Sequence, residues 1–144
     1  MTAVDSTIKE EMLLRIGADH FFDYTKEDFT KSGQTYDVIF NMVAGSSYSK
    51  CVNSLNPKGR YLLGNPRISD MLRSFLTSKF TDKTAVFAFA GEKEEELIAI
   101  KDMIEAGKIK SIIDKIYSPE QATEAHRRVE TEQRLGIVII SMGK

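Results

Sequence analysis

The sequence predicts an α/β fold with a mostly parallel sheet and helices on both faces. Strand-like and helix-like segments alternate along its 144 residues, with short connections and no low-complexity linker. Residues 36–43 form a near-continuous apolar run, which is typical of a parallel strand covered on both faces. At this length and 42% apolar composition, a single domain with a sizeable core is the simplest organisation.

The first half of the chain is predicted to run in the order strand 2–5, helix 7–16, strand 20–24, strand 36–43, helix 47–55 and strand 60–64. Thr7 and Glu10 have the spacing of a capping box, and Gly17 can end the helix that they begin. Residues 56–59, Asn-Pro-Lys-Gly, predict a turn that leads into the last of these strands.

The second half is predicted to run in the order helix 68–79, strand 84–89, helix 92–106, strand 112–114, a helix opening at Ser118, and strand 136–142. Residues 84–89 are rich in β-branched and aromatic side chains, which favour a strand. Acidic residues in its first turn and Gly107 after its end favour the helix over residues 92–106. Ser118, Pro119 and Gln121 give a capping box with proline at the first helical position.

Charge and cysteine content exclude several functions. The chain has 20 basic and 21 acidic side chains without a long run of like charge, so we expect no nucleic-acid partner. The single cysteine, Cys51, cannot form an internal disulfide, and the distant His20 and His126 give no zinc-ligand spacing, so we expect no metal.

The N-terminal residues do not resemble a targeting segment. Asp5, Glu10 and Glu11 stand where a signal peptide would be basic and then apolar, and no run approaches the length of a membrane span. We therefore expect a soluble, cytoplasmic protein with no membrane partner.

Two ordered sets of motifs resemble the medium-chain dehydrogenases/reductases, most closely the zinc-independent, quinone-oxidoreductase-like branch. The C-terminal set is GKIKSIID at 107–114, YSPEQA at 117–122, EAH at 124–126 and GIVII at 136–140. The upstream set is IGADH at 16–20, DY at 23–24, YDVIF at 36–40, PKGR at 57–60 and LGNPR at 63–67. The resemblance covers essentially the whole chain.

The resemblance implies a Rossmann-like sheet in which residues 2–5 are the second strand. The first strand and its glycine-rich loop, which hold the pyrophosphate in that fold, are not in this sequence. Residues 1–144 would then be a single partial NAD(P)-binding domain, with 108–144 resembling the segment that returns to the catalytic domain. Members of the family transfer hydride between NADPH and a quinone or enone. Without the loop, we expect the isolated chain to bind NADP or NAD weakly or not at all and to be inactive, and no catalytic residue is assigned.

The resemblance also implies an adenosine-ribose site at the first predicted strand end. Asp5 lies where an acidic residue accepts hydrogen bonds from the ribose, while Ser6, Lys9 and Tyr24 match positions that bind the NADP 2′-phosphate in the family. A carboxylate repels a phosphate, so the choice between NAD and NADP stays open. Without the resemblance, Ser6 simply caps a helix, Lys9 is solvated and Tyr24 packs.

The ends of two later strands are implied to meet the nicotinamide half of the cofactor. Val43 and Ala44 match positions that contact its ribose, and Gly64 and Asn65 match positions whose backbone contacts the nicotinamide. The family usually carries Asp at the position of Asn41 and Gly at that of Ala44. The alternative interpretation is an ordinary strand end followed by a turn.

The expected assembly is a homodimer, with a missing N-terminal catalytic portion as a further partner. Members of the family often dimerise through the strand at 84–89, and the inner strands 2–5 and 36–43 would lack their shared neighbour. The two halves of the sheet would then close up, or a second copy would supply a strand. A non-catalytic homodimeric interaction module, or a weak nucleotide-binding module, is the rival interpretation.

Overall fold

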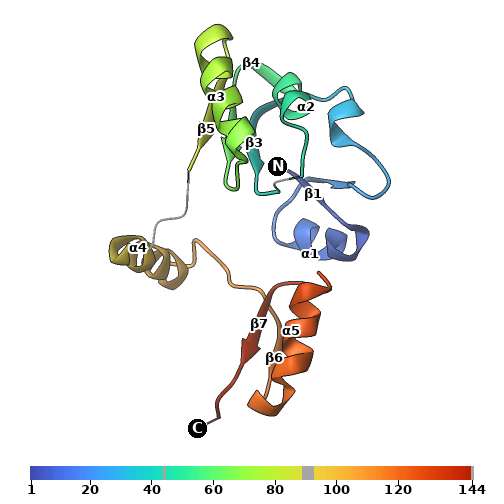
Figure 1. The fold of residues 1–144 in the computed structure, drawn as a ribbon. Helices are drawn as coiled ribbons and strands as arrows, with labels where there is room; N and C mark the ends of the chain where they lie inside the picture. The colour runs from blue at the N-terminus through green and yellow to red at the C-terminus, as the bar shows by residue number, and fades with distance from the viewer. Residues whose placement is uncertain (44, 89–92, 144) are drawn as a thin grey trace. The chain divides into compact units, whose positions relative to one another are not determined.

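The computed structural model describes residues 1–43, 45–88 and 93–143. The chain divides into two compact units, one formed by Met1–Glu27 with Lys93–Lys144 and the other by Asp28–Glu92 (Figure 1). Each unit is built from parallel strands and the helices that connect them. The predicted parallel α/β class is therefore confirmed.

The N-terminal part of the first unit is one strand–helix–strand crossover. Strand β1 (Thr2–Asp5) pairs in parallel with β2 (His20–Asp23), and the connection holds the 3-10 helix η1 (Thr7–Lys9) and helix α1 (Glu10–Arg15). Gly17 has a φ of 118°, which glycine adopts without strain, and it follows the helix end as predicted. The predicted capping box at Thr7 is wrong, because the Thr7 hydroxyl donates to Asp23 instead.

The C-terminal part of this unit repeats that arrangement. Its elements are α4 (Glu94–Glu105), β6 (Ile113–Tyr117), η3 (Pro119–Gln121), α5 (Ala122–Glu130) and β7 (Ile137–Ile140). β6 and β7 pair in parallel, and Arg128 of α5 forms an ion pair with the buried carboxylate of Asp114 in β6. The predicted capping box at Ser118 is confirmed, with the Ser118 backbone N donating to the Gln121 side chain at 3.2 Å.

The second unit is a three-stranded parallel sheet of order β3-β4-β5. Its elements are η2 (Phe29–Lys31), β3 (Tyr36–Asn41), α2 (Tyr48–Asn53), β4 (Leu55–Leu63), α3 (Ile68–Phe80) and β5 (Thr84–Phe87). A core of Tyr48, Cys51, Leu55, Tyr61, Leu63 and Ala85 joins α2 to the middle of the sheet. Tyr61 is fully buried, and its ring meets that of Tyr48 edge-on at 5.2 Å.

The predicted start of β4 is wrong. Residues 56–59 lie inside a strand that begins at Leu55, although Lys58 keeps a turn-like φ of 62°. The pairing of β3 with β4 shifts register between Tyr36 and Val38, which accommodates the irregular segment. A strand with such a bulge can contain turn residues without ending, so residues 56–59 form an irregularity inside β4 rather than a turn before it.

The prediction of one continuous sheet with residues 36–43 at its centre is also wrong. β1 and β2 form one sheet and β3, β4 and β5 another, so β3 is an edge strand. Within each sheet, the neighbouring strands match neighbours in the order 3-2-1-4-5-6. Among the described strands, none pairs with both β1 and β3.

Helix α3 covers the outer edge of β5. Ser78 Oγ accepts from the Ala85 backbone N at 2.9 Å and donates to the Ala85 carbonyl at 3.2 Å. The edge-facing backbone groups of Ala85 are therefore satisfied by a side chain rather than by another strand. The predicted strand end at Phe89 lies outside the described residues. None of the helices in the described ranges is long and apolar enough to cross a membrane.

Candidate functional site

The turn after β1 brings three of the predicted site residues together. Asp5 Oδ1 accepts from the Ser6 backbone N at 2.8 Å, and Lys9 Nζ lies 3.1 Å from the same oxygen. The 3-10 turn over Thr7–Lys9 folds the chain back so that Lys9 reaches the strand end. The side chains of Lys9 and Asp5 are 15% and 30% exposed, so this ion pair is partly shielded from water.

Tyr24 lies at the neighbouring strand end. Its backbone N donates to the Asp5 carbonyl at 3.2 Å, which ties the end of β2 to the end of β1. Its ring is 63% exposed, so Tyr24 is not part of the core. An exposed aromatic side chain at the neighbouring strand end can stack on or hydrogen-bond to a polar ligand.

Asp23 organises this edge and was not among the predicted site residues. Its buried carboxylate accepts from the Thr25 hydroxyl at 2.6 Å, the Thr25 backbone N at 2.9 Å and the Thr7 hydroxyl. These hydrogen bonds, first from Thr25 and then from Thr7, hold the pKa of Asp23 well below its usual value. The Asp-x-Thr spacing at 23–25 is a turn signal that could have revealed this role.

The ammonium group of Lys9 is already paired with carboxylates of its own unit. Besides Asp5, Lys9 Nζ lies 3.8 Å from Glu132 Oε2. A cation shared by two carboxylates offers little net positive charge to a phosphate. Asp5, by contrast, retains acceptor capacity, because a carboxylate can accept about four hydrogen bonds. The strand end therefore offers acceptors to hydroxyl groups and little net positive charge to an anion.

The turn after β3 is held by one side chain, Asn41. Its Nδ2 donates to Ser46 Oγ at 2.5 Å and to Tyr61 Oη at 2.9 Å, and its Oδ1 accepts from the Val43 backbone N at 2.9 Å. The Val43 side chain is 66% exposed. The predicted contact at Ala44 lies outside the described residues.

Gly64 and Asn65 follow the end of β4, beside the end of β3. The Gly64 backbone N donates to the Asn41 carbonyl at 2.9 Å and so extends the pairing of the two strands. A Cβ on Gly64 would lie 2.2 Å from Met42 Sδ, so glycine leaves room for the methionine side chain. Asn65 is exposed at this strand end.

Buried polar groups lie directly behind this edge. Burial raises the pKa of the Tyr61 hydroxyl and of the neighbouring Cys51 thiol, so both stay protonated at neutral pH. A neutral Tyr61 can accept from Asn41 and donate to another group at the same time. The sequence did not identify Tyr61 as a functional residue, because an apolar position within an alternating strand predicts only a place in the core.

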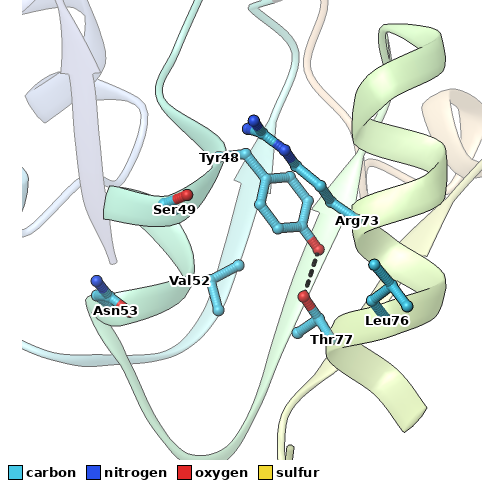
Figure 2. A pocket seen from close by; sticks show the side chains of 7 residues that line it. All are labelled: Tyr48, Ser49, Val52, Asn53, Arg73, Leu76 and Thr77. Atoms are coloured by element: carbon cyan, nitrogen blue, oxygen red, sulfur yellow. Dashed lines mark hydrogen bonds between the residues drawn. The ribbon is translucent and has the colours of Figure 1, made fainter. Parts of the chain in front are cut away.

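A shallow hollow of about 310 Å³ lies between α2 and α3 in the same unit. Figure 2 shows Tyr48 reaching across it from α2, where its hydroxyl donates to Thr77 Oγ1 of α3 at 3.0 Å. Val52 and Leu76 form apolar walls, and Arg73 lies at the rim. None of the predicted site residues lines this hollow.

The described residues do not fit a zinc site. Across residues 1–43, 45–88 and 93–143, no three His, Cys, Asp or Glu side chains gather as metal ligands would. Cys51 is buried in the core. We therefore derive no chemical step from a metal ion.

The predicted site residues fall into two groups, one in each unit. Asp5, Ser6, Lys9 and Tyr24 lie at the carboxyl ends of β1 and β2. Val43, Gly64 and Asn65 follow the carboxyl ends of β3 and β4. Ligands of open parallel sheets bind at this kind of edge.

Comparison with known proteins places the chain in a family. The family described as "Zinc-binding dehydrogenase" matches residues 16–140. The 2-methylene-furan-3-one reductase of Solanum lycopersicum is 28% identical over 142 residues, covering 97% of this chain and 33% of that protein. The chain thus spans about a third of the length of the curated relatives that it matches.

Solved structures share the fold. The quinone oxidoreductase from Coxiella burnetii has a TM-score of 0.78 at 19% identity, over 99% of this chain and 44% of that one. An NAD-dependent alcohol dehydrogenase has a TM-score of 0.72 at 20% identity, over 99% of this chain and 43% of that one. The resemblance inferred from the motifs is confirmed. This chain belongs to the zinc-binding dehydrogenase family.

Proposed function

We propose that the chain forms part of the NAD(P)-binding domain of a cytoplasmic enzyme that transfers hydride between a nicotinamide cofactor and a quinone, enone or other carbonyl compound. The observation that carries this proposal is the shielded Asp5–Lys9 pair, which lies beside Ser6 at the carboxyl end of β1. In a parallel dinucleotide-binding sheet, an acidic residue at such a strand end accepts hydrogen bonds from the adenosine ribose. The reductase and dehydrogenase relatives supply the reaction class.

The proposed chemistry depends on positioning. The nicotinamide supplies or receives the hydride when it is bound. In the first unit, Asp5 and Tyr24 would orient an adenosine ribose. In the second unit, Val43, Gly64 and Asn65 lie at a strand edge of the kind that meets a nicotinamide nucleotide. Holding two reactants in the right geometry lowers the barrier without an acid or base, so we assign no catalytic residue in this chain.

We propose that the chain prefers NAD(H) to NADP(H). Lys9 is already paired with Asp5 at 3.1 Å, so a 2′-phosphate would have to approach a carboxylate with little net positive charge nearby. Replacing Asp5→Asn removes that negative charge and leaves Lys9 with Glu132, 3.8 Å away, as its remaining carboxylate. We expect the ratio of NADPH to NADH affinity to rise several-fold in Asp5→Asn, as measured by isothermal titration with both nucleotides.

A nuclear magnetic resonance titration of the 144-residue chain tests the proposal itself. Without the glycine-rich loop we expect weak NADH binding, with a Kd on the order of 1 mM. The amide shifts should gather at Asp5, Ser6 and Lys9, and Asp5→Ala should abolish them. No shift at saturating NADH in a folded chain, or shifts confined to other residues, would contradict the proposal. The same sample should show no quinone-dependent NADPH oxidation at an enzymatic rate.

The second candidate function is a non-catalytic homodimeric interaction module. The edge position of β3 favours it, because an edge strand presents backbone groups to which another chain can pair. Nucleotide titration and molecular mass together separate the candidates. A stable dimer that shows no response to either nucleotide would support the interaction module.

A further inference from the structure

The carboxamide of Asn41 uses both of its donor hydrogens and its oxygen inside the chain. It donates to Ser46 Oγ and Tyr61 Oη and accepts from the Val43 backbone N. Because a backbone N–H only donates, the atom facing Val43 must be the oxygen, which fixes the orientation of the amide. One side chain therefore joins the end of β3, the turn after it and the buried tyrosine of β4.

Because Asn41 donates to the hydroxyl groups of Ser46 and Tyr61, the hydrogen of each hydroxyl must point towards another acceptor. Since Ser46 Oγ accepts from Asn41, its own hydrogen can go to the Val43 carbonyl, 3.0 Å away. Tyr61 Oη accepts from Asn41, and Tyr61 and Cys51 lie in the same buried cluster, so the hydrogen of the Tyr61 hydroxyl can face the Cys51 sulfur. A carboxylate at position 41 has no donor, so the hydroxyls of Ser46 and Tyr61 would have to reorient and donate to it.

Both backbone polar groups of Val43 are therefore hydrogen-bonded within the chain. Its N–H donates to Asn41, and its carbonyl accepts from the Ser46 backbone N at 3.3 Å as well as from Ser46 Oγ. A carbonyl oxygen has two lone pairs, and both have donors here. A ligand at this edge must therefore meet groups other than the Val43 backbone.

We propose that Asn41 is the positioning residue of the turn after β3, fixing Val43 and Ser46 in the arrangement that this edge presents to the nicotinamide nucleotide. The nucleotide part rests on the proposed function, whereas the control of the turn rests on the hydrogen bonds alone. Asn41 would not contact the nucleotide but would act through the turn that it holds.

Substitutions in the 144-residue chain separate the functions of the amide. Asn41→Asp keeps an acceptor for Val43 but removes both donors, and Asn41→Ala removes all three bonds. Asn53→Asp makes the same change of charge at an exposed position on α2 and serves as the control. The measurements are amide hydrogen exchange at Val43, the Raman S–H band of Cys51 and titration with NADH. Cys51 is the only cysteine in the sequence, so its band is unambiguous.

We expect Asn41→Ala to speed exchange at Val43 by about tenfold, because one protecting hydrogen bond is lost. In Asn41→Asp the Val43 amide should stay protected while the S–H band shifts, because Tyr61 then donates to the carboxylate. The described hydrogen bonds of Asn41 reach Tyr61 and not Cys51, so a shift of the S–H band reports a change in the Tyr61 hydroxyl. The control should change neither quantity.

The proposal fails if Asn41→Ala leaves Val43 exchange unchanged or if Asn41→Asp leaves the S–H band in place. Ser46→Ala, at the half-buried end of the turn, repeats the test if Asn41→Ala does not fold, and it too should speed exchange at Val43. Asn41→Ala should also weaken NADH binding several-fold, and unchanged affinity would refute the link to the nucleotide. If the unsubstituted chain shows no NADH response, the proposed function fails, while the exchange and Raman results still decide the role of Asn41.

Discussion

Among the described glycines, Gly136 is the one at which an added methyl group would meet backbone atoms most closely. A Cβ there would lie 2.3 Å from the backbone oxygen of Ile112, and the next residue, Ile137, donates to the same oxygen at 2.7 Å. Neither backbone can move without disturbing the pairing of β6 with β7. The close approach of two chain segments, rather than a special φ, requires glycine at this position.

We predict that Gly136→Ala lowers the free energy of unfolding by about 1–3 kcal/mol, because it overpacks a backbone contact. Urea denaturation followed by circular dichroism measures the change. Gly45→Ala is the matched control, since a Cβ at Gly45 meets nothing within 4 Å. Equal stability of the two variants would show that the backbone around Ile112 can shift to accommodate the methyl group at little cost in stability.

Asp28 makes the stability of the chain depend on acid pH. The hydrogen bond from Thr30, and then the one from Lys50, lower its pKa from 3.8 to about 2. A carboxylate with a lowered pKa in the folded state stabilises the fold fully above about pH 4, and this contribution is lost as the pH falls towards 2. The side chain is 34% exposed, so the contribution is modest.

We expect Asp28→Asn to flatten the fall in stability between pH 4 and pH 2, the interval between the two pKa values, as measured by thermal unfolding at stepped pH. Lys50→Gln should flatten it less, because the hydrogen bond from Thr30 is the largest cause of the lowered pKa. A larger effect from Lys50→Gln would show that the ion pair, not the turn, stabilises the carboxylate.

At the scale of elements, the contact between α3 and β5 shows how an edge strand is protected. Ser78 satisfies both edge-facing backbone groups of Ala85, so another strand cannot pair there without displacing the serine. This bears on the expected dimer through residues 84–89. A copy approaching that edge would meet a side chain where it needs a free donor and acceptor.

We predict that Ser78→Ala lowers the free energy of unfolding by about 1–3 kcal/mol, because the buried Ala85 backbone loses its partner. Faster amide exchange at Ala85 would locate the loss. Ser69→Ala, on the exposed part of the same helix, should change stability by less than about 0.5 kcal/mol. A stable Ser78→Ala variant with a protected Ala85 amide would indicate that another group forms the hydrogen bonds to the Ala85 backbone.

At the scale of the whole molecule, we propose that two copies associate through β3 rather than β5. β3 is an edge strand with Val38 and Phe40 51% and 66% exposed. Burying apolar surface of this kind contributes about 25 cal/mol per Å².

We expect the 16.2 kDa chain to sediment as a dimer at micromolar concentration. Val38→Lys should shift it towards a monomer, because a charged edge strand resists pairing. Val86→Lys introduces the same charge on β5, where the residue is 47% exposed, and should leave the dimer intact. A folded monomer at all concentrations, or dissociation only in Val86→Lys, would count against association through β3.

The sequence by itself determined the parallel α/β class, the order of the elements and the capping box at Ser118. These features depend on periodicity and on residues close in the chain, such as the hydrogen bond between Ser118 and Gln121. The sequence also identified the strand ends at Asp5 and Gly64, because a motif and a strand end can both be read locally. The assignment of those residues to a nucleotide stays a prediction.

Only the tertiary structure decided which distant side chains meet. Thr7 bonds to Asp23 rather than capping its own helix, Asn41 bonds to Tyr61, and Ser78 closes the edge at Ala85. The division into separate sheets was likewise decided by strand pairing, which joins β3 only to β4 among the described strands. A side-chain hydroxyl or amide can form hydrogen bonds to nearby residues of the chain or to a neighbouring strand. Its partner is fixed only when packing brings a complementary donor or acceptor within about 3 Å.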